Sequence, residues 1–182
     1  MGISRAPNSV KLFIALLANH EALFPQLDRE LAGFFGAKDS SSEILPWTLT
    51  DYYQEEMGSG LLRRFVSFEP LVSPDKLADI KVMTQTLEAR YQWVRGHRRG
   101  RRANIDPGYL NADKVVLATT KDASHRIYLH SGIYAEATLR FHSGSFQPFD
   151  HTYPDYRWAE SLSFFSSVRS LYLRQLKRID PS

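Results

Sequence analysis

Charged side chains gather in the second half of the chain, where they could bind an anion or move a proton. Lys121 and Asp122 follow an apolar run, Arg126 comes shortly afterwards, and Glu136 lies in the next apolar stretch. Ammonium and guanidinium groups donate hydrogen bonds to phosphates, and a carboxylate can accept a proton or bind a metal. If the strands pair, Lys121, Arg126 and Glu136 converge at one end of a sheet. The alternative is that these charges are solvent-facing cross-strand pairs.

A second group surrounds the dipeptide Pro107-Gly108. Proline and glycine in this order suit the two central positions of a type II turn. The sequence therefore predicts a tight turn over residues 104–109. Asp106 and Tyr109 are not explained by the turn itself, so they either stabilise it or point into a cleft.

Adjacent carboxylates form a third group. Glu55 and Glu56, after Tyr53, could bind a divalent cation through their oxygens, but the spacing is not that of a known metal-binding loop. A solvated helical turn is the alternative. The chain has no cysteine, and its six histidines do not fall at helical ligand spacing. The identity of any metal or cofactor is therefore left open.

A run of arginines is the fourth group. Clustered arginine beside aromatic residues is typical of single-stranded nucleic-acid binding, because guanidinium groups contact phosphates and rings stack on bases. Two glycines in the run also allow a solubilising or disordered turn. Tyr91 and Trp93 precede the arginines, which are Arg95, Arg98, Arg99, Arg101 and Arg102.

Composition and missing motifs exclude several classes of protein. Without cysteine there is no disulfide framework and no thiol nucleophile. The phosphate-loop, dinucleotide, nucleophile-elbow and zinc-protease motifs are also missing from the sequence. No apolar run approaches the roughly 20 residues that a membrane helix needs. The apolar stretch at residues 12–18 lacks a signal-peptide cleavage site, so we expect a soluble cytoplasmic protein.

The apolar pattern predicts an α+β fold in a single domain of residues 1–182. Strands are expected at residues 10–18, 44–50, 62–68, 114–120, 126–129 and 133–141, and residues 38–42 are expected to form a loop. Three amphipathic helices are expected after His20, Ser73 and Tyr153. The order strand, helix, strand, strand, helix suggests a ferredoxin-like start, followed by an antiparallel meander. The sheet is therefore expected to be mixed but mostly antiparallel.

Several blocks together resemble the bacterial and archaeal domain-of-unknown-function family 4416. They occur in the family's order over nearly the whole chain. The resemblance implies a stand-alone protein of this length and no established activity. A GTP-binding label carried by some relatives has no phosphate-loop motif to support it here. The blocks are Tyr52 and Tyr53 with Glu56, Met57 and Gly58, and residues 104–110, 117–122, 126–129, 132–139 and 152–157.

The leading hypothesis is a binding protein or enzyme for an anionic small molecule, such as a nucleotide or a phosphorylated metabolite. One alternative is an RNA-binding accessory module that uses the arginine run. Another is a non-catalytic interaction protein, which would show a broad apolar surface patch and no charged cleft. The candidate catalytic residues are Asp106, Lys121 and Glu136, and the candidate ligand contacts are Glu56, Tyr109, Asp122 and Arg126.

Overall fold

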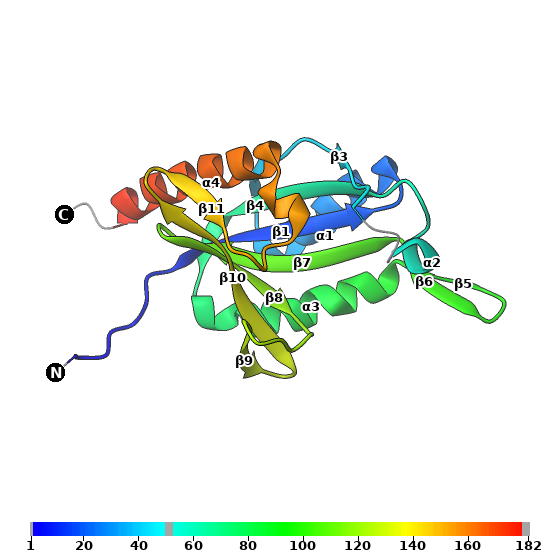
Figure 1. The fold of residues 1–182 in the computed structure, drawn as a ribbon, viewed down its shortest axis with the longest axis horizontal. Helices are drawn as coiled ribbons and strands as arrows, with labels where there is room; N and C mark the ends of the chain where they lie inside the picture. Colours follow the sequence, from blue (N-terminus) through cyan, green and yellow to red (C-terminus); the bar gives the residue numbers. More distant parts are fainter. Residues whose placement is uncertain (1, 50–52, 180–182) are drawn as a thin grey trace.

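The computed structural model describes residues 2–49 and 53–179. Its main feature is a nine-stranded antiparallel sheet (Figure 1). Seven strands form the path β11-β10-β8-β7-β1-β4-β2, while β3 pairs with β4 and β9 pairs with β10. The strands are β1 (Val10–Ala18), β2 (Lys38–Ser41), β3 (Leu45–Pro46), β4 (Leu62–Val72), β7 (Ala103–Leu110), β8 (Lys114–Thr119), β9 (Ile127–His130), β10 (Ile133–His142) and β11 (Ser145–Pro148).

Three long helices cover the sheet. The helices α1 (Phe24–Phe35) and α3 (Leu77–Arg90) pack on one face, and α4 (Ala159–Ile179) packs on the other (Figure 1). A short helix, α2 (Gln54–Met57), lies beside a separate ribbon made of β5 (Gln92–Arg95) and β6 (Arg98–Arg101). Single 3-10 turns occupy Glu21–Leu23, Pro74–Lys76 and Pro154–Arg157, the last of which is η4.

β1 is the central strand and is buried on both faces. Side chains alternate between the faces of a strand, so Ile14 joins the core under α1 and α3 while Phe13 joins the core under α4. The ring of Phe13 meets Phe165 of α4 edge-on, with the ring centroids 5.0 Å apart. Because both faces are covered, the apolar run that predicts β1 has almost no polar interruption.

The turn predicted for residues 104–109 is wrong, because these residues lie inside β7 and pair with β1. Gly108 serves close packing instead of a turn, since a Cβ atom there would lie 2.3 Å from the Phe13 ring and 2.5 Å from the Val116 carbonyl oxygen. β8 pairs with β7 only at Gly108–Leu110, so Pro107 removes no hydrogen bond from the β7–β8 ladder. The dipeptide therefore marks the point where two strands separate.

Other elements agree in part with the pattern. β1, β4, β8 and the β9–β10 hairpin are confirmed, and so are the three long helices. The loop expected at residues 38–42 is wrong, because Lys38–Ser41 pairs with β4 as an edge strand. The strand expected at residues 44–50 is reduced to Leu45–Pro46, and Thr50 lies outside the described residues. β11 and the ribbon of β5 and β6 were not predicted.

The described residues include no helix that is both long enough and apolar enough to cross a membrane.

Candidate functional site

A pocket of about 530 Å³ opens where β7 and β8 separate. The two strands pair only at Gly108–Leu110 with Val115–Leu117, whereas β8 stays paired with β10 as far as Thr119. The end of β8 therefore follows β10 and leaves β7. The gap between them is lined by Asn104 and Asp106 on one side and by residues 117–121 on the other.

Side chains of α3 hold this gap open. The N–H of Ile105 donates to Glu88, and Lys81 Nζ donates to the Ile105 carbonyl at 3.3 Å. Backbone groups in a buried strand need a partner, and here Glu88 and Lys81 take the place of β8. The strands can therefore stay apart without leaving the Ile105 backbone unsatisfied.

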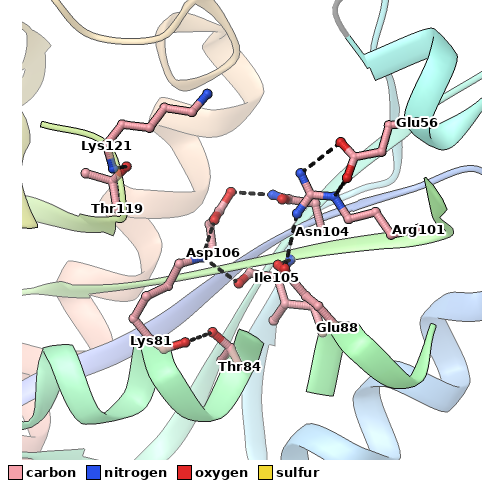
Figure 2. A network of polar contacts seen from close by, with 10 residues as sticks. All are labelled: Glu56, Lys81, Thr84, Glu88, Arg101, Asn104, Ile105, Asp106, Thr119 and Lys121. Atoms are coloured by element: carbon pink, nitrogen blue, oxygen red, sulfur yellow. Dashed lines mark hydrogen bonds and ion pairs between the residues drawn. The ribbon is translucent and has the colours of Figure 1, made fainter. Parts of the chain in front are cut away.

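Asp106 is the carboxylate at the centre of the gap (Figure 2). Its Oδ1 accepts from Lys81 Nζ at 2.7 Å, and its Oδ2 accepts from Asn104 Nδ2. Burial acts to raise the pKa of Asp106, but the nearby cations Lys81 and Arg63 and the hydrogen bond from Asn104 together outweigh it, and the pKa lies below its usual value. Since 28% of the side chain is exposed, Asp106 is an ionised, oriented carboxylate that a ligand can reach.

Arg101 closes the end of the pocket near α2 and α3. Its Nε lies 2.9 Å from Glu56 Oε1, and its Nη1 donates to Glu88 Oε2 at 3.1 Å (Figure 2). Burial raises the pKa of Glu88, which disfavours its ionised form. Burial also raises the pKa of Tyr53 to about 12, so this phenol stays protonated beside the Arg101 guanidinium.

Arg63 of β4 brings unused hydrogen-bond donors to the pocket wall. Its Nη2 lies 2.7 Å from Asp155 Oδ2 in an ion pair. Within the part of the chain that the structure describes, Nε and Nη1 of Arg63 have no hydrogen-bond partner, although only 8% of the side chain is exposed. The indole N–H of Trp47, another buried lining residue, is also unpartnered there. Buried donors without partners are rare in folded proteins, so these three nitrogens need an explanation.

Aromatic rings supply much of the remaining lining. The rings of Trp47 and Tyr53 are in contact, with centroids 5.4 Å apart. Tyr153 and Tyr156 come from the segment around η4, which leads into α4. A flat apolar group would find rings at several points of the wall.

Three of the sequence-predicted site residues line this pocket. They come from distant parts of the chain: Glu56 from α2, Asp106 from β7, and Lys121 from the segment after β8. Figure 2 shows Thr119 and Lys121 across the gap from Asp106. The structure therefore sets at one pocket the aspartate and the lysine that the sequence proposes for chemistry.

Arg126 and Glu136 lie just outside the pocket lining. Arg126 Nε donates to Glu136 Oε2 at 2.7 Å, and its other nitrogens donate to the Lys121 carbonyl at 2.9 Å and to the Tyr153 hydroxyl at 3.0 Å. The Glu136 side chain is fully buried, with His125 Nε2 3.3 Å away. This pair therefore supports two lining residues, Lys121 and Tyr153, from behind.

Tyr109 and Asp122 do not line the pocket. Tyr109 packs against the small core cluster that contains Leu77 and Val116, on the face of β7 opposite Asp106. Asp122 is exposed, one residue beyond Lys121.

The arginine run is divided by the fold. Arg101 turns toward the pocket, whereas Arg98, Arg99 and Arg102 are exposed. Arg95 lies in β5, and its side chain is outside the described part of the structure. Tyr52, from the family-like block before α2, also lies outside the described residues.

Sequence reasoning missed much of the charged lining, although one signal was available. Lys81 and Glu88 lie on the same line of α3 as Leu77 and Thr84, at spacings of four, three and four residues. Charges on an otherwise apolar stripe indicate a polar site beneath the helix. Arg63 gives a similar signal, because it shares a strand face with the buried Phe65. The residues missed are Trp47, Arg63, Lys81, Glu88 and Asp155.

No group of three or more histidine and acidic side chains suited to a metal ion occurs among residues 2–49 and 53–179.

A family model described as a domain of unknown function, DUF4416, matches residues 8–172. The chain belongs to the DUF4416 family. The match includes every residue named above as lining the pocket. No curated protein and no solved structure matches this DUF4416 chain. Its function must therefore be argued from the pocket itself.

Proposed function

We propose that the pocket between β7 and β8 binds a small molecule with an anionic group, such as a nucleotide or a phosphorylated metabolite. The observation that carries this proposal is the position of Arg63. Two of its nitrogens are buried at the pocket wall without a partner among the described residues. An unpaired buried donor costs about 1–3 kcal/mol, and more when charged. A bound phosphate or carboxylate would remove that cost, because its oxygens match the guanidinium fork.

The charges of the lining also support an anionic ligand. Four cations and four carboxylates line the pocket, but each carboxylate is within ion-pair distance of a cation of the protein. The carboxylates therefore do not offer a set of free acceptors to a cationic ligand. The pairs are Glu56 and Glu88 with Arg101, Asp106 with Lys81, and Asp155 with Arg63.

The size and the aromatic lining support a nucleotide in particular. The pocket falls within the range of about 300–1,000 Å³ typical of small-molecule sites. A base can stack on rings such as Trp47 and Tyr53 while its phosphate meets Arg63. A charged pocket of this kind is not what a non-catalytic interaction protein requires, so the ligand-binding hypothesis is preferred.

If the protein acts on its ligand, Asp106 and Lys121 are the residues we propose for the chemistry. Asp106 is held as an ionised carboxylate and can accept a proton from a bound molecule. Lys121 can contribute positive charge from the opposite side of the gap. Glu136 has no part in this proposal, since it does not line the pocket.

A ligand screen tests the proposal. The midpoint of thermal unfolding would be measured with nucleotides, sugar phosphates and inorganic phosphate, each with and without Mg²⁺. A ligand that binds only the folded state at 100 times its Kd adds about 2.7 kcal/mol of stability. We expect at least one nucleotide or phosphorylated metabolite to raise the midpoint by several degrees. No shift from any member of the panel would contradict the proposal.

We also propose that β1, α1, β2, β4 and α3 form a ferredoxin-like start of the fold. The strand order β7-β1-β4-β2 and the packing of α1 and α3 on one face of β1 support this. The arrangement sets β7 beside β1 and so positions Asp106 over the core.

A further inference from the structure

The ribbon of β5 and β6 forms an arm that extends from the body of the protein beside α2 (Figure 1). Between Glu88 and Asp106 the chain has six arginines and no acidic residue. Arg98, Arg99 and the neighbouring His97 are exposed, and so is Val94, at 67%. The arm is therefore a cationic surface that meets little of the rest of the protein.

The base of the arm is firmly attached. The N–H of Arg102 donates to the Tyr91 carbonyl at 2.9 Å, and the buried Tyr91 donates through its hydroxyl to Glu30 at 2.8 Å. A Cβ atom at Gly100 would lie 2.0 Å from the Glu56 carbonyl oxygen, so the backbone of α2 packs directly on the ribbon. The body of the protein thus presents the arm in a defined direction.

The arm is a two-stranded ribbon of β5 and β6. An isolated two-stranded ribbon is only marginally stable. The exposed Arg98 and Arg99 are adjacent like charges that repel each other, and an anionic partner would reduce this repulsion.

The arm also continues the pocket. Arg99 and Arg101 are two residues apart in β6, so their side chains leave the same face of the ribbon, with their Cα atoms roughly 7 Å apart. Arg101 lines the pocket, and Arg99 lies one step further out along the exposed arm. A molecule with several phosphates in a row could therefore contact the pocket and the arm together.

We propose that the arm of β5 and β6 binds single-stranded nucleic acid through Arg98 and Arg99, with one nucleotide of the bound strand in the pocket. The second half of this inference rests on the proposed function. A single strand fits better than a membrane surface, because the arm exposes one large apolar side chain, Val94, and leads to a pocket lined with aromatic rings.

Fluorescence anisotropy with labelled 12-nucleotide RNA and DNA strands tests the arm. The double variant Arg98→Ala/Arg99→Ala should bind at least 10-fold more weakly than wild type. Each lost phosphate contact should also reduce the slope of log affinity against log salt by about 0.7, which gives about 1.4 for two. The matched control is Arg174→Ala/Arg178→Ala, which removes two exposed arginines from α4 at the other end of the molecule and should change neither quantity.

A second readout separates this inference from the proposed function. The thermal shift caused by a mononucleotide should be the same in wild type and in the arm variant. The inference is wrong if the mononucleotide raises the unfolding midpoint of wild type but the RNA and DNA strands do not bind, or bind the arm variant equally well. The proposed function stands in that case. If the RNA or DNA strands bind through the arm but no mononucleotide raises the unfolding midpoint, the placement of a nucleotide in the pocket is wrong. Arm-dependent binding to phosphatidylserine vesicles without strand binding would also overturn the inference.

Discussion

Lys81 Nζ lies 2.7 Å from Asp106 Oδ1 and joins a helix to a strand where the sheet divides. The lysine is buried, and it also donates to the carbonyl of Ile105. Its position explains how β7 keeps its backbone groups paired after β8 has left. The same contact holds the central carboxylate of the pocket in place, so one side chain serves both the fold and the site.

Replacement of Lys81 should therefore reduce stability. In Lys81→Met the Asp106 carboxylate loses its cation partner, and the Ile105 carbonyl loses a donor. Because Asp106 is partly exposed, we expect a loss of about 2–3 kcal/mol, less than the 3–5 kcal/mol of a fully buried pair. The change in the free energy of unfolding is measured by urea unfolding. Lys76→Met, which removes a solvent-exposed pair with Asp79, should stay within about 0.5 kcal/mol of wild type, and equal losses in both variants would contradict the account.

Gly108 should not tolerate a side chain. In Gly108→Ala the new methyl group meets the Phe13 ring and the Val116 carbonyl, so we expect a loss of about 1–3 kcal/mol or more. The control is Gly33→Ala, at an exposed position of α1 with nothing within 4 Å of the added atom. Helix propensity predicts a gain of up to about 1 kcal/mol there. A neutral Gly108→Ala would show that β7 and β8 are not packed as described.

Asp106 and Glu88 should affect stability with opposite dependence on pH. The folded-state pKa of Asp106 lies below its usual value of 3.8, so its contribution is present above that value and is lost as the pH falls through the folded pKa. The folded-state pKa of Glu88 lies above 4.5, so stability falls as the pH rises from 4.5 through the folded pKa.

Unfolding free energies measured from pH 2 to pH 7 test this difference. Asp106→Asn should lose less stability than wild type on acidification. Glu88→Gln should lack the decrease that wild type shows above pH 4.5. The reverse assignment of these two effects would show that the charges around the pocket are not arranged as described.

Glu136 should behave as a structural residue. In Glu136→Gln the buried Arg126 loses its ionised partner, so we expect a destabilisation of about 3 kcal/mol. Ligand binding by the folded variant should remain within about 3-fold of wild type, since Glu136 does not line the pocket. Glu55→Gln, at an exposed position of α2, is the control for stability. A stable variant that no longer binds would instead assign Glu136 to the site.

The sequence pattern was sufficient to predict the strands and helices whose hydrophobic period is clear. β1 has the predicted bounds, because a strand buried on both faces reads as a continuous apolar run. Pro107 and Gly108 gave a wrong prediction for a physical reason. The residues that form a tight turn also permit close packing and the loss of a partner strand, and only the neighbouring strands distinguish the two.

The site was predictable only in part for a similar reason. Glu56, Asp106 and Lys121 were selected by residue type, and the sheet brings them to one pocket. Arg63 and Lys81 were not among the predicted site residues, because each lies in a strand or a helix that was predicted from its apolar residues alone. The separation of β7 from β8 could not be predicted from Pro107 and Gly108 alone, because it also depends on β8 pairing with β10.

The most direct test of the central claim compares two neighbouring arginines of β4. Arg63 faces the pocket, whereas Arg64 faces α1 and donates to Asp28 at 3.2 Å. Calorimetric titration would use the ligand found in the screen, with wild type, Arg64→Met, and Arg63→Met/Asp155→Asn, which avoids leaving a buried carboxylate unpaired. We expect the last variant to fold and to bind at least about 10-fold more weakly, as for loss of a charged hydrogen bond, and Arg64→Met to bind like wild type. Unchanged affinity in the folded Arg63 variant would contradict the account.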